Sequence, residues 1–236
     1  MNENKETFDI IAFLDRHKWK IIVPAVLILM AVIMVATVNS KKKYDVYALY
    51  IGSQFVDNMA HANFALAVGS FSDTDFYDDG EINVSFSPML YLTQDARDHY
   101  DENDLYYNLQ TNVETLQEFY RTIAVGTYIV IMMDDQVYEE LKAKETTVLA
   151  PLSEIFTDVP SNSFDEYAFY LKDTPLGEKL SENSDLPFPE NTVICARSFP
   201  YIASMVGKEE KQKHYDYQIE LFKNLTQKES VTLNND

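Results

Sequence analysis

The chain has 236 residues, of which 19 are Lys or Arg and 38 are Asp or Glu, so its formal net charge is −19. This length allows one domain of ordinary size or two small ones, and a hydrophobic content of 46% excludes a disordered protein because there is enough apolar surface for a core. The acidic charge argues against nucleic acid as a partner, and the single cysteine excludes an internal disulfide and any multi-cysteine zinc site.

The first predicted element is a transmembrane helix over residues 19–38. Residues 21–38 read IIVPAVLILMAVIMVATV, a run of eighteen residues without a charge. As a helix this run measures about 27 Å, close to the roughly 30 Å apolar core of a bilayer. Trp19 stands at its edge, as is typical of the membrane interface, and Pro24 is expected in the first turn, where few hydrogen bonds are lost. The lipid bilayer is therefore a predicted partner, and residues 7–14 are predicted to extend the helix before the span.

A buried core helix and a cleaved signal peptide are the alternatives to this anchor. The uncharged run is long for a core helix, and it also exceeds the usual 7–15 apolar residues, roughly, of a signal peptide. The sequence ATVN at 36–39 is moreover a poor cleavage site. We therefore favour an uncleaved, single-pass anchor.

The orientation of the anchor rests on the long region that follows it. Basic residues on the two flanks nearly tie, so they do not decide the direction. Residues 44–236 contain 12 basic and 34 acidic residues, and long domains are exported largely regardless of charge. We predict a cytoplasmic segment at 1–18, a basic spacer at 39–43, and an extracytoplasmic domain at 44–236 of a cell-membrane protein.

Strands and helices are predicted to alternate after the spacer. Residues 44–52 are rich in β-formers and end at a glycine, so they predict a strand. Residues 54–68 predict a helix whose apolar residues are Phe55, Met59, Ala62 and Leu66. Residues 70–80 form an acidic loop, and 81–92 alternate as a second strand that is broken near Pro88.

The next elements repeat this order. Residues 105–125 have apolar side chains at three- and four-residue steps and predict a long helix after an acidic connection at 95–104. Residues 128–133 are continuously apolar, which is typical of a strand buried on both faces. Asp134 and Asp135 are then predicted to cap another helix. Strand and helix thus alternate three times, which favours an α/β fold with a mostly parallel sheet and flanking helices.

The last third of the chain is less regular. Residues 167–171 and 192–196 each predict a strand, and residues 173–190 between them predict a loop. Residues 208–227 predict a charged final helix with Tyr215, Ile219 and Phe222 on one side.

Residues 126–156, GTYIVIMMDDQVYEELKAKETTVLAPLSEIF, resemble extracellular solute-binding proteins of the type II periplasmic-binding fold. In that family a central strand ends in Asp, a helix follows, and a Pro-Leu turn closes the unit. Residues 169–180, FYLKDTPLGEKL, are similar to a chain returning from the hinge between two lobes. The resemblance implies one lobe, or a minimal two-lobe form, of this fold. Because no lipidated cysteine follows the apolar run, it implies a reduced relative anchored by its helix instead.

A ligand site is predicted where the strands end. Ligands of open α/β sheets bind outside the carboxyl ends of the strands. Gly52, Ser87 and Asp134 are expected at those ends, and Tyr91 and Tyr128 are expected to add aromatic surface beside them. We predict that these five residues line a site for a small solute or peptide, without a cofactor.

Catalytic and metal chemistry are disfavoured by the residues present. The acidic loops at 70–80 and 95–104 could offer oxygens to Ca²⁺, but the first does not have EF-hand spacing, and we predict no metal site. The histidines are dispersed, Cys195 lies in an apolar strand, and no G-x-S-x-G or Gly-rich phosphate loop occurs.

The function predicted from the sequence is a membrane-anchored, extracytoplasmic binding module without catalysis, similar to a solute-binding protein. The alternative is a structural or assembly subunit that uses the fold as an interaction surface for a membrane-protein partner. A hydrolase with an unrecognised pair of carboxylates is the third reading, because 34 acidic residues in the domain leave such a pair open.

Overall fold

The computed structural model describes residues 10–39, 43–92, 109–144, 146–182, 187–199 and 208–227; in the first helix the described side chains are those of 18–20 and 22–34. The chain divides into two compact units, residues 1–43 and residues 44–236. The acidic connection predicted at 95–104 and the N-terminal residues 1–9 lie outside the described residues.

The first unit contains one helix, α1 (Ile10–Asn39). It begins earlier than the predicted span, so Pro24 lies inside the helix and not in its first turn. Its described apolar side chains are exposed from Trp19 (69%) to Met34 (69%), and the consecutive residues 26–30 place them on every side of the helix. Among the fully described residues, no helix combines the length and the apolar character that a membrane span requires.

The second unit is built on one five-stranded sheet with the order β2-β1-β3-β5-β4. The strands are β1 (Val46–Gly52), β2 (Val84–Leu90), β3 (Val130–Asp134), β4 (Ala168–Tyr170) and β5 (Thr192–Ala196). Each overlaps a range that was predicted as a strand. Each is rich in apolar or β-branched residues, and β1, β3 and β5 are buried almost throughout because helices cover both faces.

The sheet is mixed, so the prediction of a mostly parallel sheet is wrong. Strand β1 pairs in parallel with β2 and with β3, whereas β5 pairs antiparallel with both β3 and β4. The interior strand β5 enters the sheet late and between two earlier strands. A strand buried on both faces has the same apolar composition in either direction, so composition alone does not indicate its orientation.

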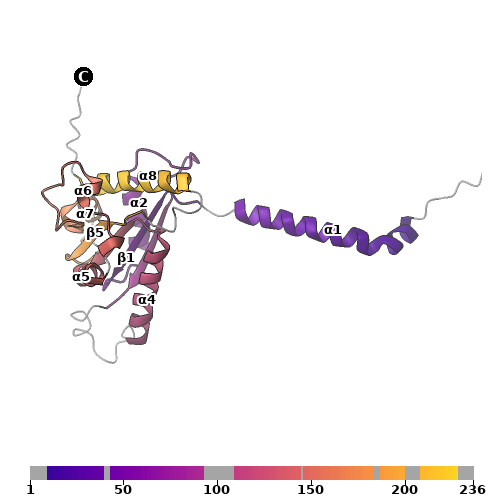
Figure 1. Ribbon diagram of the computed structural model, residues 1–236, viewed down its shortest axis with the longest axis horizontal. Helices are drawn as coiled ribbons and strands as arrows, with labels where there is room; N and C mark the ends of the chain where they lie inside the picture. The colour runs from indigo at the N-terminus through magenta and orange to yellow at the C-terminus, as the bar shows by residue number, and fades with distance from the viewer. Residues whose placement is uncertain are drawn as a thin grey trace, which may run out of the picture. The chain divides into compact units, whose positions relative to one another are not determined.

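Two helical layers cover the sheet, which lies between them (Figure 1). One face packs against α2 (Asn58–Gly69), α6 (Leu152–Ile155), α7 (Pro175–Ser181) and α8 (Lys208–Thr226). The other packs against α4 (Leu109–Val125) and α5 (Asp135–Lys144). Two short 3-10 helices, Thr146–Val148 and Leu171–Asp173, complete the described elements. Because α2 follows β1 on one face and α5 follows β3 on the other, the chain leaves the ends of these two neighbouring strands toward opposite faces of the sheet.

Helix α7 lies in the segment 173–190, which was predicted to be a loop. Thr174 caps it by accepting a hydrogen bond from the Gly177 backbone N–H at 3.1 Å, and Pro175 occupies the first turn. A threonine followed by proline is a known helix start, so the signal for α7 was present in the sequence.

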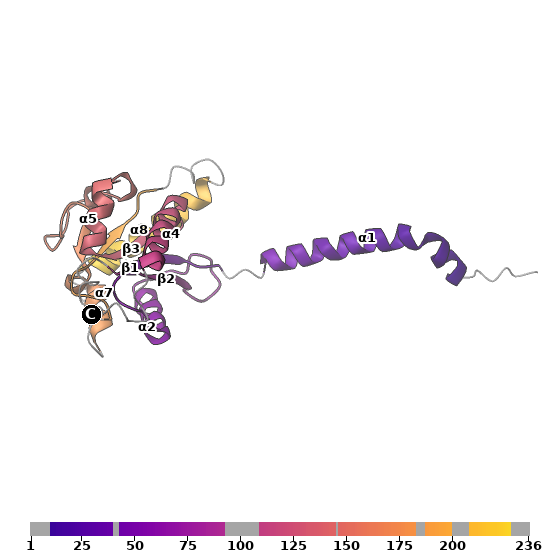
Figure 2. The ribbon, with the colours of Figure 1, turned by 90° about the horizontal axis from the view of Figure 1, so that it is seen from below.

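Helix α2 is present but begins four residues later than predicted, so Phe55 precedes it, and the predicted apolar residues Met59 and Leu66 are exposed. Its buried residues are Phe64, Ala67 and Val68, which lie on the other side of the helix. The Phe64 ring stacks on Phe86 of β2 with centroids 4.0 Å apart, and this aromatic pair sets the rotation of the helix. Figure 2 shows α2 on the outside of the domain, near α7.

Candidate functional site

The carboxyl ends of the parallel strands β1 and β3 lie side by side, and the buried carboxylate of Asp134 lies there. The Asp134 side chain accepts hydrogen bonds from the Tyr50 hydroxyl (3.1 Å), from the Ser53 hydroxyl (2.7 Å) and from the Ser53 backbone N–H (2.8 Å). The Tyr50 hydroxyl in turn accepts from the Gln54 backbone N–H at 3.2 Å. Asp134 is 2% exposed, so this network is internal to the domain.

Gly52 is required for this network because the carboxylate and the phenol lie against its backbone. A Cβ atom at this position would overlap the Asp134 Oδ1 atom and the Tyr50 hydroxyl oxygen. Burial raises the pKa of Asp134, although the hydrogen bonds from Ser53 and Tyr50 oppose that shift. Burial next to Asp134 also raises the pKa of Tyr50, so the phenol stays protonated and donates to the carboxylate.

The structure brings together three of the five predicted site residues. Gly52 and Asp134 are adjacent, and the Tyr91 backbone N–H donates to the Gly52 carbonyl at 2.8 Å. The Tyr91 ring is buried in the layer formed with α4 and α5, so it offers little surface to a ligand. Ser87 is in the middle of β2, paired with Leu49, and not at a strand end as predicted.

Tyr128 lies at the other end of the sheet. It precedes β3, and its ring packs edge-on against Tyr47 near the start of β1, with centroids 6.0 Å apart. The expected grouping of Tyr128 with Asp134 is therefore wrong. Tyr128 precedes the start of β3 and Asp134 ends it, so the length of the strand separates the two residues.

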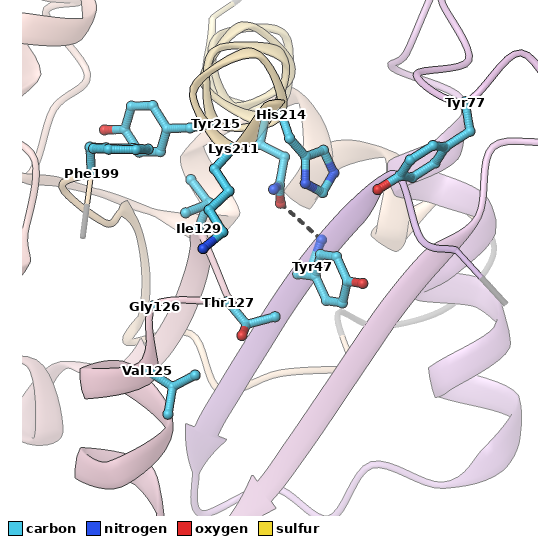
Figure 3. Close-up of a pocket in the computed structure, with 11 residues that line it drawn as sticks. Tyr47, Tyr77, Val125, Gly126, Thr127, Ile129, Phe199, Lys211, His214 and Tyr215 are labelled. Atoms are coloured by element: carbon cyan, nitrogen blue, oxygen red, sulfur yellow. Dashed lines mark hydrogen bonds between the residues drawn. The ribbon is translucent and has the colours of Figure 1, made fainter. Parts of the chain in front are cut away.

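A pocket of about 360 Å³ lies at the amino ends of β1 and β3, under helix α8. Its floor and walls come from β1, from the chain between α4 and β3, and from α8. The lining residues are Tyr47, Tyr77, Val125, Gly126, Thr127, Ile129, Phe199, Lys211, His214, Tyr215 and Gln218. Figure 3 shows Lys211 extending from α8 toward Thr127, with Tyr47 and Tyr77 on the side toward β1.

The electrostatics of this pocket differ from those of the chain as a whole. No acidic side chain is among its lining residues, although the chain has 38 Asp and Glu, and Lys211 is the charged residue that lines it. Among the described residues, no carboxylate pairs with Lys211. Burial raises the pKa of Tyr47 and of Tyr77, so both phenols are protonated at neutral pH and are able to donate hydrogen bonds.

Two polar residues of α8, the buried Gln218 and the half-buried His214, fix one wall of the pocket. The Gln218 Oε1 atom accepts from the Tyr47 backbone N–H at 2.9 Å, shown dashed in Figure 3. The His214 Nε2 atom lies 2.7 Å from the Asp45 backbone oxygen and therefore donates to it. Burial lowers the pKa of His214, against the opposing effect of Asp45 and Glu210. His214 is accordingly neutral at pH 7, and Lys211 supplies the charge.

The residues of α8 that line the pocket were not predicted as site residues from the sequence. Lys211, His214, Tyr215 and Gln218 recur at steps of three, one and three residues, which places them on one side of a helix. This pattern was available from the sequence. It was obscured because a helix rich in Lys and Glu is normally solvated on most of its surface.

Two other candidate groups from the sequence, Cys195 and the acidic loop at 70–80, take part in packing and in local hydrogen bonds. Cys195 is fully buried in β5, and burial raises the pKa of its thiol, so a reactive thiolate is disfavoured. In the loop at 70–80, the Asp75 carboxylate accepts from the backbone N–H groups of Tyr77 (3.0 Å) and Gly80 (2.6 Å), which closes the loop. Within the described part of the chain, no group of three or more His, Cys, Asp or Glu is arranged to hold a metal ion.

The two ends of the sheet are thus chemically distinct, with a closed carboxylate network at one end and an open, basic and aromatic pocket at the other. No protein-family model, curated protein or solved structure matches this chain.

Proposed function

We propose that this protein is a single-pass, membrane-anchored module whose α/β domain lies outside the cell and binds a small organic anion without catalysis. The observation that carries the binding proposal is the pocket under α8, because its lining residues include a lysine and several hydrogen-bond donors but no acidic side chain.

The membrane anchor is supported by the sequence of α1. Residues 21–38 carry no charge, and a helix of this length matches a bilayer core. Apolar side chains are exposed on every side of the described part of α1, a distribution that suits an apolar solvent better than water. The outward placement of residues 44–236 is proposed because this long acidic region follows the anchor, and long domains are exported largely regardless of charge.

The class of ligand follows from the groups that line the pocket. The Lys211 ammonium, the Thr127 hydroxyl and the phenols of Tyr47 and Tyr77 are all able to donate hydrogen bonds to an anion. Val125, Ile129, Phe199 and Tyr215 supply apolar and aromatic walls. A small carboxylate with an apolar or aromatic body fits both sets of groups, and its volume suits a cavity of about 360 Å³.

The relation to solute-binding proteins remains part of this proposal. Residues 126–156 resemble such proteins in sequence, and β1, β2 and β3 with their crossovers are arranged as in other open α/β sheets. We propose a reduced, single-lobe relative. Its ligand would bind at the amino ends of β1 and β3, because the Asp134 carboxylate at the opposite end already accepts three internal hydrogen bonds.

The proposal is tested with the full chain in detergent micelles, using phenylacetate as the probe. A ligand that binds only the folded state at ten times its Kd adds about 1.4 kcal/mol to the free energy of unfolding. For a domain of this size the melting temperature should then rise by about 3–5 °C. Phenethylamine, which replaces the carboxylate by an ammonium, should leave the melting temperature unchanged because it would face Lys211.

Two variants locate the site. Lys211→Met keeps the length of the side chain and removes its charge, so the effect of phenylacetate should be lost while the fold is retained. Lys213→Met is the matched control, because Lys213 is exposed on the same helix and does not line the pocket. Equal stabilisation of both variants by phenylacetate would refute anion binding at this pocket.

A further inference from the structure

His214 presents a hydrogen-bond acceptor to the pocket under α8. Its ring lies on α8 between Lys211 and Tyr77 (Figure 3). The Nε2 atom lies 2.7 Å from the Asp45 backbone oxygen, and a carbonyl oxygen has no hydrogen to donate, so the Nε2 atom must carry one. In the neutral ring the Nδ1 atom is then left with a lone pair, which can only accept a hydrogen bond.

The surroundings of the His214 ring leave this lone pair open to a ligand. No described residue forms a hydrogen bond with the Nδ1 atom, and it is not one of the buried polar atoms that lack a partner, so it is accessible to solvent. Aromatic rings enclose much of the imidazole, with centroids 4.6 Å away for Phe76 and 5.9 Å away for Tyr47 and Tyr77. Because His214 also lines the pocket, the accessible lone pair faces its interior. Burial lowers the pKa of His214, so the lone pair is present at neutral pH.

The lone pair of His214 and the ammonium of Lys211 require different groups on the ligand. They are three residues apart on α8 and therefore neighbours on one side of the helix. The Lys211 ammonium only donates hydrogen bonds and suits an anion, but the anion has no hydrogen to give to the Nδ1 atom. A purely apolar ligand body would displace water from the Nδ1 atom and leave the lone pair without a partner, which weakens binding.

We propose that the ligand of this pocket is a hydroxylated organic anion, whose anionic group binds at Lys211 and whose hydroxyl donates a hydrogen bond to the His214 Nδ1 atom. This inference rests on the proposed function, because it requires an anion in the same pocket. It adds the class of ligand, since a site that hydrogen-bonds a hydroxyl discriminates against the analogue without one. A volume of about 360 Å³ admits a hydroxylated aromatic ring with a short acidic side chain.

A series of probes of similar size tests the hydroxyl. Phenylacetate is compared with its 3-hydroxy, 4-hydroxy, 3-fluoro and 4-fluoro derivatives by titration calorimetry of the full chain in micelles at pH 7.5. Fluorine is close to a hydroxyl in size but donates no hydrogen bond. At least one hydroxy derivative should have a Kd at least about three-fold below those of phenylacetate and of the matching fluoro derivative, as one added hydrogen bond supplies. Equal Kd values for the hydroxy and fluoro derivatives at both positions would overturn this inference alone, whereas failure of the whole series to bind would also refute the proposed function.

Two variants assign the preference to the Nδ1 atom. His214→Gln places its amide nitrogen near the position of Nε2 and keeps a donor for the Asp45 oxygen, but it has no acceptor at the position of Nδ1. The ratio of the fluoro to the hydroxy Kd should therefore fall to about one, a ratio that a merely structural role of His214 would not change. His214→Asn places an amide oxygen near the position of Nδ1 and gives up the bond to Asp45, so it should be less stable but retain part of the preference. A preference retained in full by His214→Gln would overturn the proposal, whatever the asparagine variant shows.

Discussion

At the scale of single residues, Gly52 is a position where an added Cβ atom would overlap two buried polar side chains. We expect Gly52→Ala to force Asp134 and Tyr50 apart and to lower the free energy of unfolding by about 2–3 kcal/mol. The matched control is Gly69→Ala, because the nearest atom to an added Cβ there is Ile82 Cγ2 at 3.9 Å, and its effect should be below about 1 kcal/mol. Urea unfolding of the full chain in micelles measures both, and equal midpoints would contradict this account of Gly52.

The site residues show what spacing in a sequence does and does not determine. Gly52 and Asp134 were correctly placed together because each ends a strand that was correctly identified, and parallel neighbours end at the same edge. Tyr128 was misplaced because proximity to a strand in sequence does not distinguish the two ends of that strand. Lys211 was missed because it belongs to α8, which begins more than seventy residues after the end of β3. Its place in the pocket depends on how α8 packs against the sheet, and the sequence does not indicate this.

At the scale of elements, α4 is held to the end of β2 by one asparagine. The Asn112 Oδ1 atom accepts from the Leu92 backbone N–H, and its Nδ2 atom donates to the Leu92 carbonyl, both at 2.8 Å. We expect Asn112→Ala to cost about 1–3 kcal/mol, because it leaves both buried backbone groups without a partner. Gln117→Ala, on an exposed position of the same helix, should change little.

A further substitution separates these two hydrogen bonds. Asn112→Asp keeps the acceptor for the Leu92 N–H but sets a carboxylate against the Leu92 carbonyl, so it should also destabilise the domain at neutral pH. Lowering the pH to protonate that carboxylate should restore part of the loss. Urea midpoints at pH 7 and pH 4 measure this, and an Asn112→Ala variant as stable as Gln117→Ala would refute the role given to Asn112.

Most elements were predictable because each has a strong local pattern, whereas their arrangement depends on long-range contacts. The apolar run of β3 and the periodic spacing of α4 are signals of this kind, and both elements are present. The antiparallel entry of β5 between β3 and β4 leaves no such signal, because it joins segments far apart in the chain. The rotation of α2 likewise depends on a tertiary contact, the stacking of Phe64 on Phe86. This contact turns Met59 and Leu66, which the spacing in the sequence predicts to be buried, toward solvent.

At the scale of the whole molecule, charge is divided unevenly between the two units. Residues 1–43 contain seven basic and four acidic residues, whereas residues 44–236 contain 12 basic and 34 acidic ones. The excess of basic residues in the first unit comes from Lys41, Lys42 and Lys43 after the apolar run, because residues 1–20 contain four basic and four acidic residues, so the flanking charges do not decide the orientation. The anionic lipids of the cytoplasmic leaflet would repel the large acidic unit, which is consistent with its proposed position outside the cell.

This arrangement predicts which cysteines a membrane-impermeant maleimide reaches in intact cells. In a Cys195→Ala background, we expect Thr157→Cys to be labelled in intact cells and Asn4→Cys only after lysis. Cys195 itself should react poorly even in lysates, because it is fully buried and burial raises the pKa of its thiol. Labelling of Asn4→Cys but not Thr157→Cys in intact cells would reverse the orientation. Labelling of neither, with both reacting after lysis, would place the domain inside the cell and remove the basis for an extracytoplasmic binding module.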